Sequence, residues 1–172
     1  MAHYPVNHHL RPVYRAVAGL IGLYFLAFGI LGAVASWGDP LFDRGAVWVL
    51  GLRTNLAWSL LAAVSGVVVL AAVVIGGNLY QRVTTVAGWG LLVLAVFHLA
   101  VLQTEVNILN FSMVDVLACM VAGLLLITAG LYGRVQPAGA PEHTEPGVGN
   151  EPVAKSAPRQ AAPRPVRDTA DR

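Results

Sequence analysis

The apolar and polar positions divide the chain into four long apolar runs separated by short polar breaks. The runs cover about residues 13–37, 54–77, 83–103 and 111–133. A helix needs about 20 predominantly apolar residues to cross the hydrocarbon core of a bilayer, and each run reaches that length. The pattern predicts an all-α integral membrane protein with four transmembrane helices.

The two ends of the chain differ from the transmembrane domain, which we place at residues 13–134. Residues 1–12 are polar and basic and form an N-terminal segment. Residues 135–172 hold seven of the ten prolines and few apolar side chains. Because such a segment cannot bury enough surface to offset the entropy of ordering, it predicts a disordered tail.

The first run also resembles a secretory signal peptide. A basic segment precedes it, and Ala33-Val34-Ala35 is similar to a cleavage site. Its apolar stretch of about twenty residues is longer than the core of a signal peptide, which favours a retained helix.

The connections between the runs carry their own signals. Residues 38–53 are too apolar for a free loop. They predict a short interfacial or re-entrant segment, with Trp37 and Trp48 at the level of the lipid headgroups. Residues 78–82 predict a tight connection between the second and third runs.

The arginines near the membrane predict an orientation. The side with the chain ends carries Arg11, Arg15, Arg82 and Arg134, and the opposite side carries Arg44 and Arg53. Because cytoplasmic segments are enriched in Lys and Arg, this distribution predicts a plasma-membrane protein whose N- and C-termini are cytoplasmic. Tyrosines near these arginines are expected in the interfacial aromatic belt: Tyr14, Tyr80 and Tyr132.

A short motif occurs twice along the chain. Residues 79–83 read LYQRV and residues 131–135 read LYGRV, at an offset of 52 residues. The offset predicts two repeated helical hairpins of the same orientation. Anchoring at the membrane surface would select the same motif without a duplication, so both explanations stay open.

Small residues spaced four apart predict close helix packing. The pairs are Ala18/Gly22, Gly29/Ala33, Gly32/Ser36, Ala62/Gly66 and Ala118/Ala122. Such pairs let the backbones of membrane helices approach closely. We favour packing within one bundle; the alternative is a homo-oligomer interface through the glycine-rich face of the first run.

Polar residues at membrane depth are the candidates for a functional site. The break at residues 103–115 contains several of them, and helix lengths place others at the same depth on the side opposite the chain ends. The candidate outer-leaflet polar cluster consists of Arg53, Asn55, His98, Glu105, Asn110 and Asp115.

Two interpretations of this cluster are open. Ionisable residues inside a membrane often mark a binding site or a proton relay, and an Asp115–His98 pair could pass a proton. Alternatively, Ser112-x-x-Asp115 has the spacing of a helix capping box, with the acid in the first turn. His98 could also bond to a neighbouring helix or reach the water outside the membrane. We favour the structural interpretation.

The residues that would support enzyme or cofactor chemistry are missing from the pattern. His98 is the only histidine in the runs, so a haem bound by two histidines is disfavoured. No zinc-ligand spacing, nucleotide-binding fingerprint or nucleophile–base set occurs. Cys119, the single cysteine, is expected to pack in the core. We therefore predict no cofactor, no metal, no enzymatic activity and no nucleic-acid partner.

Three stretches resemble a known family. They are PVNHHLRPVYRAVAGLIGLYFLAFGILG at 5–32, WVLGLRTN at 48–55 and LNFSM at 109–113. Together they are similar to an actinobacterial membrane-protein family known as domain of unknown function 4383, over about residues 5–135. The resemblance implies a four-helix plasma-membrane protein and implies no activity.

These patterns lead to a functional hypothesis. We expect a non-enzymatic structural or accessory bundle in the lipid bilayer, whose partner is a second copy or a membrane complex. The alternative is a small transporter or proton-coupled carrier that uses Asp115 and His98. A quinone-binding redox accessory subunit is a third hypothesis.

Overall fold

The computed structural model describes residues 10–133, so the predictions for residues 1–9 and for the tail lie outside it. Four helices make up most of this part: α1 (Arg11–Ala35), α2 (Leu56–Ile75), α3 (Gly77–Val101) and α4 (Met113–Leu131). All four are long and apolar enough to cross a membrane. The predicted helices are confirmed, and their ends differ from the prediction by two residues, except at the start of α3.

The turn between α2 and α3 is shorter than predicted. The Gly76 amide donates to Ala72 O at the end of α2, and the Tyr80 amide donates to Gly76 O at the start of α3. Gly76 and Gly77 have φ angles of 75° and 61°, which glycine adopts readily because it lacks a Cβ. The prediction of a loop at 78–82 is therefore wrong. Tyr80 is buried rather than part of an interfacial belt.

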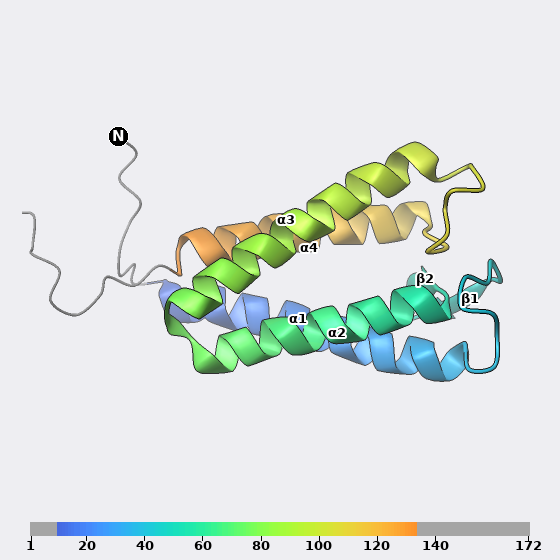
Figure 1. Ribbon diagram of the computed structural model, residues 1–172. Helices are drawn as coiled ribbons and strands as arrows, with labels where there is room; N and C mark the ends of the chain where they lie inside the picture. The colour runs from blue at the N-terminus through green and yellow to red at the C-terminus, as the bar shows by residue number, and fades with distance from the viewer. Residues whose placement is uncertain (1–9, 134–172) are drawn as a thin grey trace, which may run out of the picture. The chain divides into compact units, whose positions relative to one another are not determined.

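A β-ribbon lies in the connection between α1 and α2, where the sequence predicts a short interfacial or re-entrant segment. Its position at the level of the lipid headgroups stays a prediction. Strands β1 (Val47–Val49) and β2 (Leu52–Thr54) pair antiparallel. Leu50 and Gly51 between them have φ angles of 48° and 84°, and a type I′ hairpin turn needs a positive φ at both positions. We call the end of the bundle with this ribbon and residues 102–112 the ribbon end, and the end with the Gly76-Gly77 turn the Gly76 end (Figure 1).

The helices pack as two hairpins, α1 with α2 and α3 with α4 (Figure 1). A Cβ on Gly66 would lie 2.7 Å from Gly22 O, and one on Gly88 would lie 2.7 Å from Gly123 O. Glycine therefore permits these contacts, which confirms packing within the bundle for α1 and α2. Because α2 covers the glycine-rich face of α1, that face is not free to contact a second copy.

The Ala118/Ala122 pair has a different environment from the glycine contacts. Both alanines line a groove between α1 and α4, together with larger side chains such as Leu117. The close α3–α4 contact instead runs through Gly123 and Gly130, whose Cβ atoms would meet Gly88 O and the Thr85 hydroxyl, respectively. Both alanines pack against the larger core cluster, which agrees with packing within the bundle, but they do not form the close α3–α4 contact.

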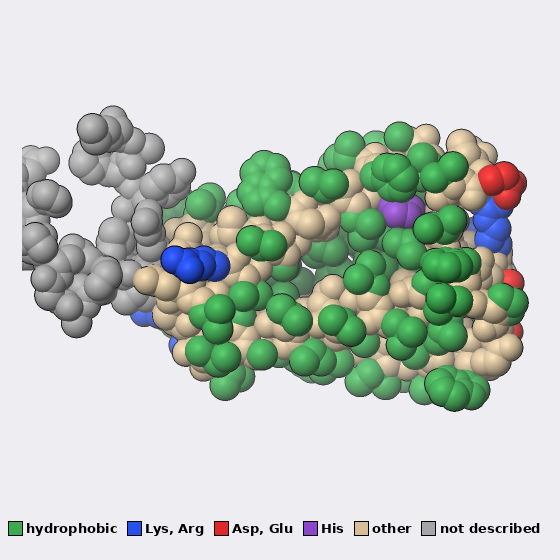
Figure 2. All heavy atoms as spheres, viewed as in Figure 1, with side chains coloured by type: hydrophobic (Ala, Val, Ile, Leu, Met, Phe, Trp, Pro, Cys, Tyr) green, Lys and Arg blue, Asp and Glu red, His purple; other side chains and the backbone are tan. Residues whose placement is uncertain are grey.

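The buried core consists of two clusters, one toward each end. The larger includes Phe25, Phe28, Trp58 and Phe111, and the smaller consists of Ala18, Val69, Tyr80, Leu126 and Ala129. Figure 2 shows hydrophobic side chains along the sides of the bundle and charged side chains gathered toward its ends. This distribution matches a protein whose middle lies in hydrocarbon and whose ends reach water.

Candidate functional site

The two loops at the ribbon end exchange hydrogen bonds through buried asparagines. Asn55 Nδ2 donates to Ile108 O at 2.8 Å, and Asn110 Nδ2 donates to Thr54 O at 3.1 Å and to Gly45 O at 2.7 Å. Both asparagine side chains are almost completely buried. Each loop therefore supplies an amide that satisfies backbone carbonyls of the other loop.

The same asparagines also shape their own loops. Asn55 is the N-cap of α2, and its Oδ1 accepts a hydrogen bond from the Trp58 amide at 2.9 Å. Asn110 has a φ of 58°, in the left-handed region that asparagine tolerates better than most residues. Asn107 closes the second loop, since its Oδ1 accepts from the Phe111 amide at 2.9 Å. All three side chains thus bond to the backbone.

Asp115 caps α4 and also joins it to the ribbon. Its Oδ2 accepts from the amide and the hydroxyl of Ser112, and the capping box suggested by the sequence is present. The Arg53 amide donates to the same oxygen at 3.3 Å. Oδ1 is buried and has no hydrogen-bond partner among residues 10–133.

The charged groups of Arg53 and Glu105 point to other partners. The Arg53 guanidinium donates to Arg44 O at 2.9 Å and to Gly45 O at 3.3 Å, so only its backbone amide contacts Asp115. Glu105 forms an ion pair with Arg44, and its side chain is 96% exposed. Such exposed pairs contribute little to stability because water screens them. Arg44 was missing from the predicted cluster, and only the folded loops reveal this pairing.

His98 lies outside the hydrogen-bond network of Asp115. Its Nδ1 pairs with Leu94 O in the preceding turn of α3 at 2.9 Å. Its ring stacks on Phe111 with a centroid distance of 4.2 Å, and Phe111 in turn contacts Trp58 at 4.7 Å. Nε2 is buried without a hydrogen-bond partner in the described part of the chain. No hydrogen bond joins His98 to Asp115 there.

The geometry therefore divides the predicted cluster. Four members form one network: Arg53, Asn55, Asn110 and Asp115. Glu105 lies at its exposed edge, and His98 packs in the aromatic core. Within residues 10–133, no group of three His, Cys, Asp or Glu side chains is placed to hold a metal ion. No protein-family model, curated protein or solved structure matches the chain.

We expect substitutions at Asn110 to separate its hydrogen bonds from its backbone conformation. Asn110→Gly keeps the left-handed φ but removes the hydrogen bonds to Thr54 O and Gly45 O, which should lower the free energy of unfolding by about 1–3 kcal/mol. The free energy of unfolding of Asn110→Ala should be about 1 kcal/mol lower than that of Asn110→Gly, because the Cβ of alanine disfavours this φ. Denaturant titration in mixed micelles measures both, with the exposed Glu105→Gln as a control of little effect. Equal stabilities of the two Asn110 variants would contradict the contribution assigned to the left-handed backbone conformation.

Proposed function

We propose that this chain is a non-enzymatic structural or accessory bundle of the plasma membrane. The observation that carries the proposal is how the buried polar side chains at the ribbon end are used. Asn55, Asn107 and Asn110 bond to loop backbone, and Asp115 Oδ2 caps a helix. Asn107 and Asn110 also line a polar pocket, but their amide groups are already bonded to loop backbone and are not free for a ligand. Here they hold two loops together.

The α1–α4 groove supports a membrane partner as part of this proposal. It has a volume of about 530 Å³ and an apolar lining. Ala118 and Ala122 lie one helical turn apart in that lining, and small residues allow another transmembrane helix to approach closely. The partner is a second copy of the chain or a subunit of a membrane complex.

A photoreactive residue in the groove tests this proposal. We expect position 117, exposed in the groove, to give one discrete cross-linked product in native membranes, because a docked helix would lie against it. Position 93, equally apolar and exposed on α3, is the matched control and should give much less. A product of twice the chain mass identifies a second copy. Equal yields at both positions, or extraction of the protein alone as a monomer, would contradict the proposal.

A second candidate function is a small transporter or proton-coupled carrier. It is supported by two buried polar atoms without hydrogen-bond partners in the described part, Asp115 Oδ1 and His98 Nε2. Ionisable groups at membrane depth are costly to bury, and they often serve transport. The separation of His98 from the Asp115 network weakens this candidate.

Reconstitution separates the two candidates. If the chain is a carrier, proton flux into liposomes should fall in a variant with Asp115→Asn and His98→Ala, because both groups that could exchange a proton are lost. An accessory bundle should show the same background flux in the wild type and in this variant. Far-UV circular dichroism checks that the variant is folded. Equal fluxes in the wild type and the variant would contradict the carrier hypothesis.

We propose further that the Gly76 end and both termini face the cytoplasm. In the described part, Arg11, Arg15 and Arg82 belong to the Gly76 end, and Arg44 and Arg53 to the ribbon end. Arg15 donates to Val73 O at 2.7 Å, so it also caps the last turn of α2. The excess of arginine at the Gly76 end supports this orientation.

Cysteine labelling tests the orientation. In a Cys119→Ala background, Asp39→Cys at the ribbon end should react with a membrane-impermeant maleimide on intact cells, because both that residue and the reagent are outside. Asn78→Cys at the Gly76 end should react only after the membrane is opened. Both positions are exposed, so access to water decides the result. The reverse pattern would overturn the orientation.

A duplicated hairpin and the resemblance to domain of unknown function 4383 are also proposals. The duplication is supported by the reciprocal bonds of Asn55 and Asn110, each donated from one hairpin to the loop of the other. In both hairpins, a side chain caps the second helix, Asn55 in α2 and Ser112 in α4. Relatives whose two halves align along their whole length would support the duplication, and relatives that share only the pentapeptide would count against it.

A further inference from the structure

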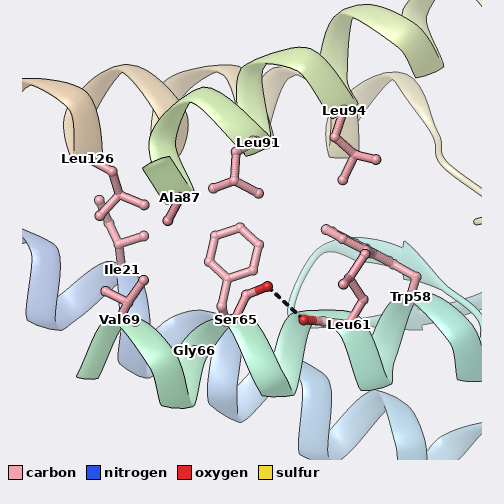
Figure 3. A pocket seen from close by; sticks show the side chains of 13 residues that line it. Ile21, Trp58, Leu61, Ser65, Gly66, Val69, Ala87, Leu91, Leu94 and Leu126 are labelled. Carbon is pink, nitrogen blue, oxygen red and sulfur yellow. Dashed lines mark hydrogen bonds between the residues drawn. The ribbon is translucent and has the colours of Figure 1, made fainter. Parts of the chain in front are cut away.

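An apolar pocket lies between the two hairpins, where the buried core is interrupted. Its volume is about 260 Å³. Phe25 and Trp58 from one core cluster and Val69 and Leu126 from the other contribute to its lining. Figure 3 shows Leu91 and Leu94 on α3 directed toward α2 across this space. A hollow between the two hairpins is visible in Figure 2.

The lining offers almost nothing to a polar or charged ligand. The Ser65 hydroxyl already donates to Leu61 O at 2.8 Å, as the dashed line in Figure 3 marks. The Trp58 indole nitrogen is buried and is a single neutral donor. An apolar cavity of about 150 Å³ is known to stay dry and to admit an apolar molecule. This larger pocket therefore favours a hydrocarbon occupant over water or a headgroup.

Gly90 is the lining glycine that helix packing does not explain. Cβ atoms on Gly22 and Gly66 would meet α2 side chains and α1 backbone, respectively, at 3.1 Å or less. A Cβ on Gly90 would find no atom within 4 Å. Glycine within a helix makes that helix less stable than alanine would. At position 90 no close packing contact requires glycine to offset this cost. Its effect is to leave the α3 side of the pocket open.

The pocket has the depth of one leaflet. Its lining on α2 extends from Trp58 to Val69, about 16 Å at 1.5 Å per residue. Half of a hydrocarbon core of about 30 Å is a similar length. Leu61 and Gly90 are exposed members of the lining, on the faces of α2 and α3 that a bilayer would surround. The surrounding molecule of matching chemistry and length is a lipid chain.

We infer that this pocket holds one acyl chain of a membrane phospholipid from the leaflet on the ribbon side. The chain fills the gap between the two core clusters, and the headgroup stays at the membrane surface. This site adjoins the groove proposed for a partner helix, since Ile21 and Phe25 line both, but it requires neither a partner nor a particular orientation of the protein.

Tryptophan quenching by brominated lipid tests the inference. Trp58 lines the pocket but is only 1% exposed, whereas Trp37, Trp48 and Trp89 are exposed and can be replaced by Phe. Because a pocket covers most of its ligand, a bromine-labelled acyl chain inside it would lie beside the Trp58 ring. The bromine should therefore quench Trp58 emission, roughly twofold. The measurement compares phosphatidylcholine vesicles brominated along one chain with unbrominated vesicles.

Two further variants decide the outcome. Gly90→Leu should place a side chain in the pocket and abolish most of the quenching, whereas Ala100→Leu, on an exposed part of α3, should leave it unchanged. Ala87→Leu narrows the same pocket and replaces Gly90→Leu if that variant does not fold. Absence of quenching in the parent, or equal quenching after the pocket is filled, overturns the inference. Quenching by a brominated free fatty acid but not by the phospholipid overturns the choice of occupant.

Discussion

The arrangement of the two hairpins depends on the hydrogen bonds that their loops exchange at the ribbon end. Close glycine contacts, such as Gly88 against Gly123, hold each hairpin together internally. The bonds from Asn55 to Ile108 O and from Asn110 to Thr54 O instead cross between hairpins. Apolar side chains in hydrocarbon gain little from meeting each other rather than lipid, so polar contacts and close packing must position the helices.

Because the hairpins are joined mainly at the two ends, the middle of the bundle is loosely packed. Hydrogen bonds join the hairpins at the ribbon end, and Tyr14 stacks on Tyr132 at the Gly76 end with a centroid distance of 4.9 Å. Between these ends lie the apolar pocket on one side and the α1–α4 groove on the other, and Ile21 and Phe25 line both. In water such spaces would be destabilising, but a bilayer supplies chains and helices that can fill them. The partner helix and the lipid chain proposed for the protein would occupy these two spaces.

The candidate site shows why residue type and depth alone were insufficient to predict which side chains contact one another. Ser112-x-x-Asp115 is a local signal, and the capping box that it suggests is present. Arg53 contacts Asp115, but only through a backbone amide that almost any residue could supply. His98 matched Asp115 in predicted depth, yet its ring faces Phe111. Depth along a helix follows from residue number, whereas the direction of a side chain depends on which helices become neighbours.

The sequence by itself determined four membrane-length helices and the cap of α4, because these depend on the composition of one segment or on residues within one turn. It did not reveal the β-ribbon, since Leu50-Gly51 lacks the usual Asn-Gly signal of a type I′ turn. The tertiary structure alone decided which loops exchange bonds, because these bonds join residues 53 to 65 positions apart. It also decided where packing fails, because a pocket is a property of four helices together.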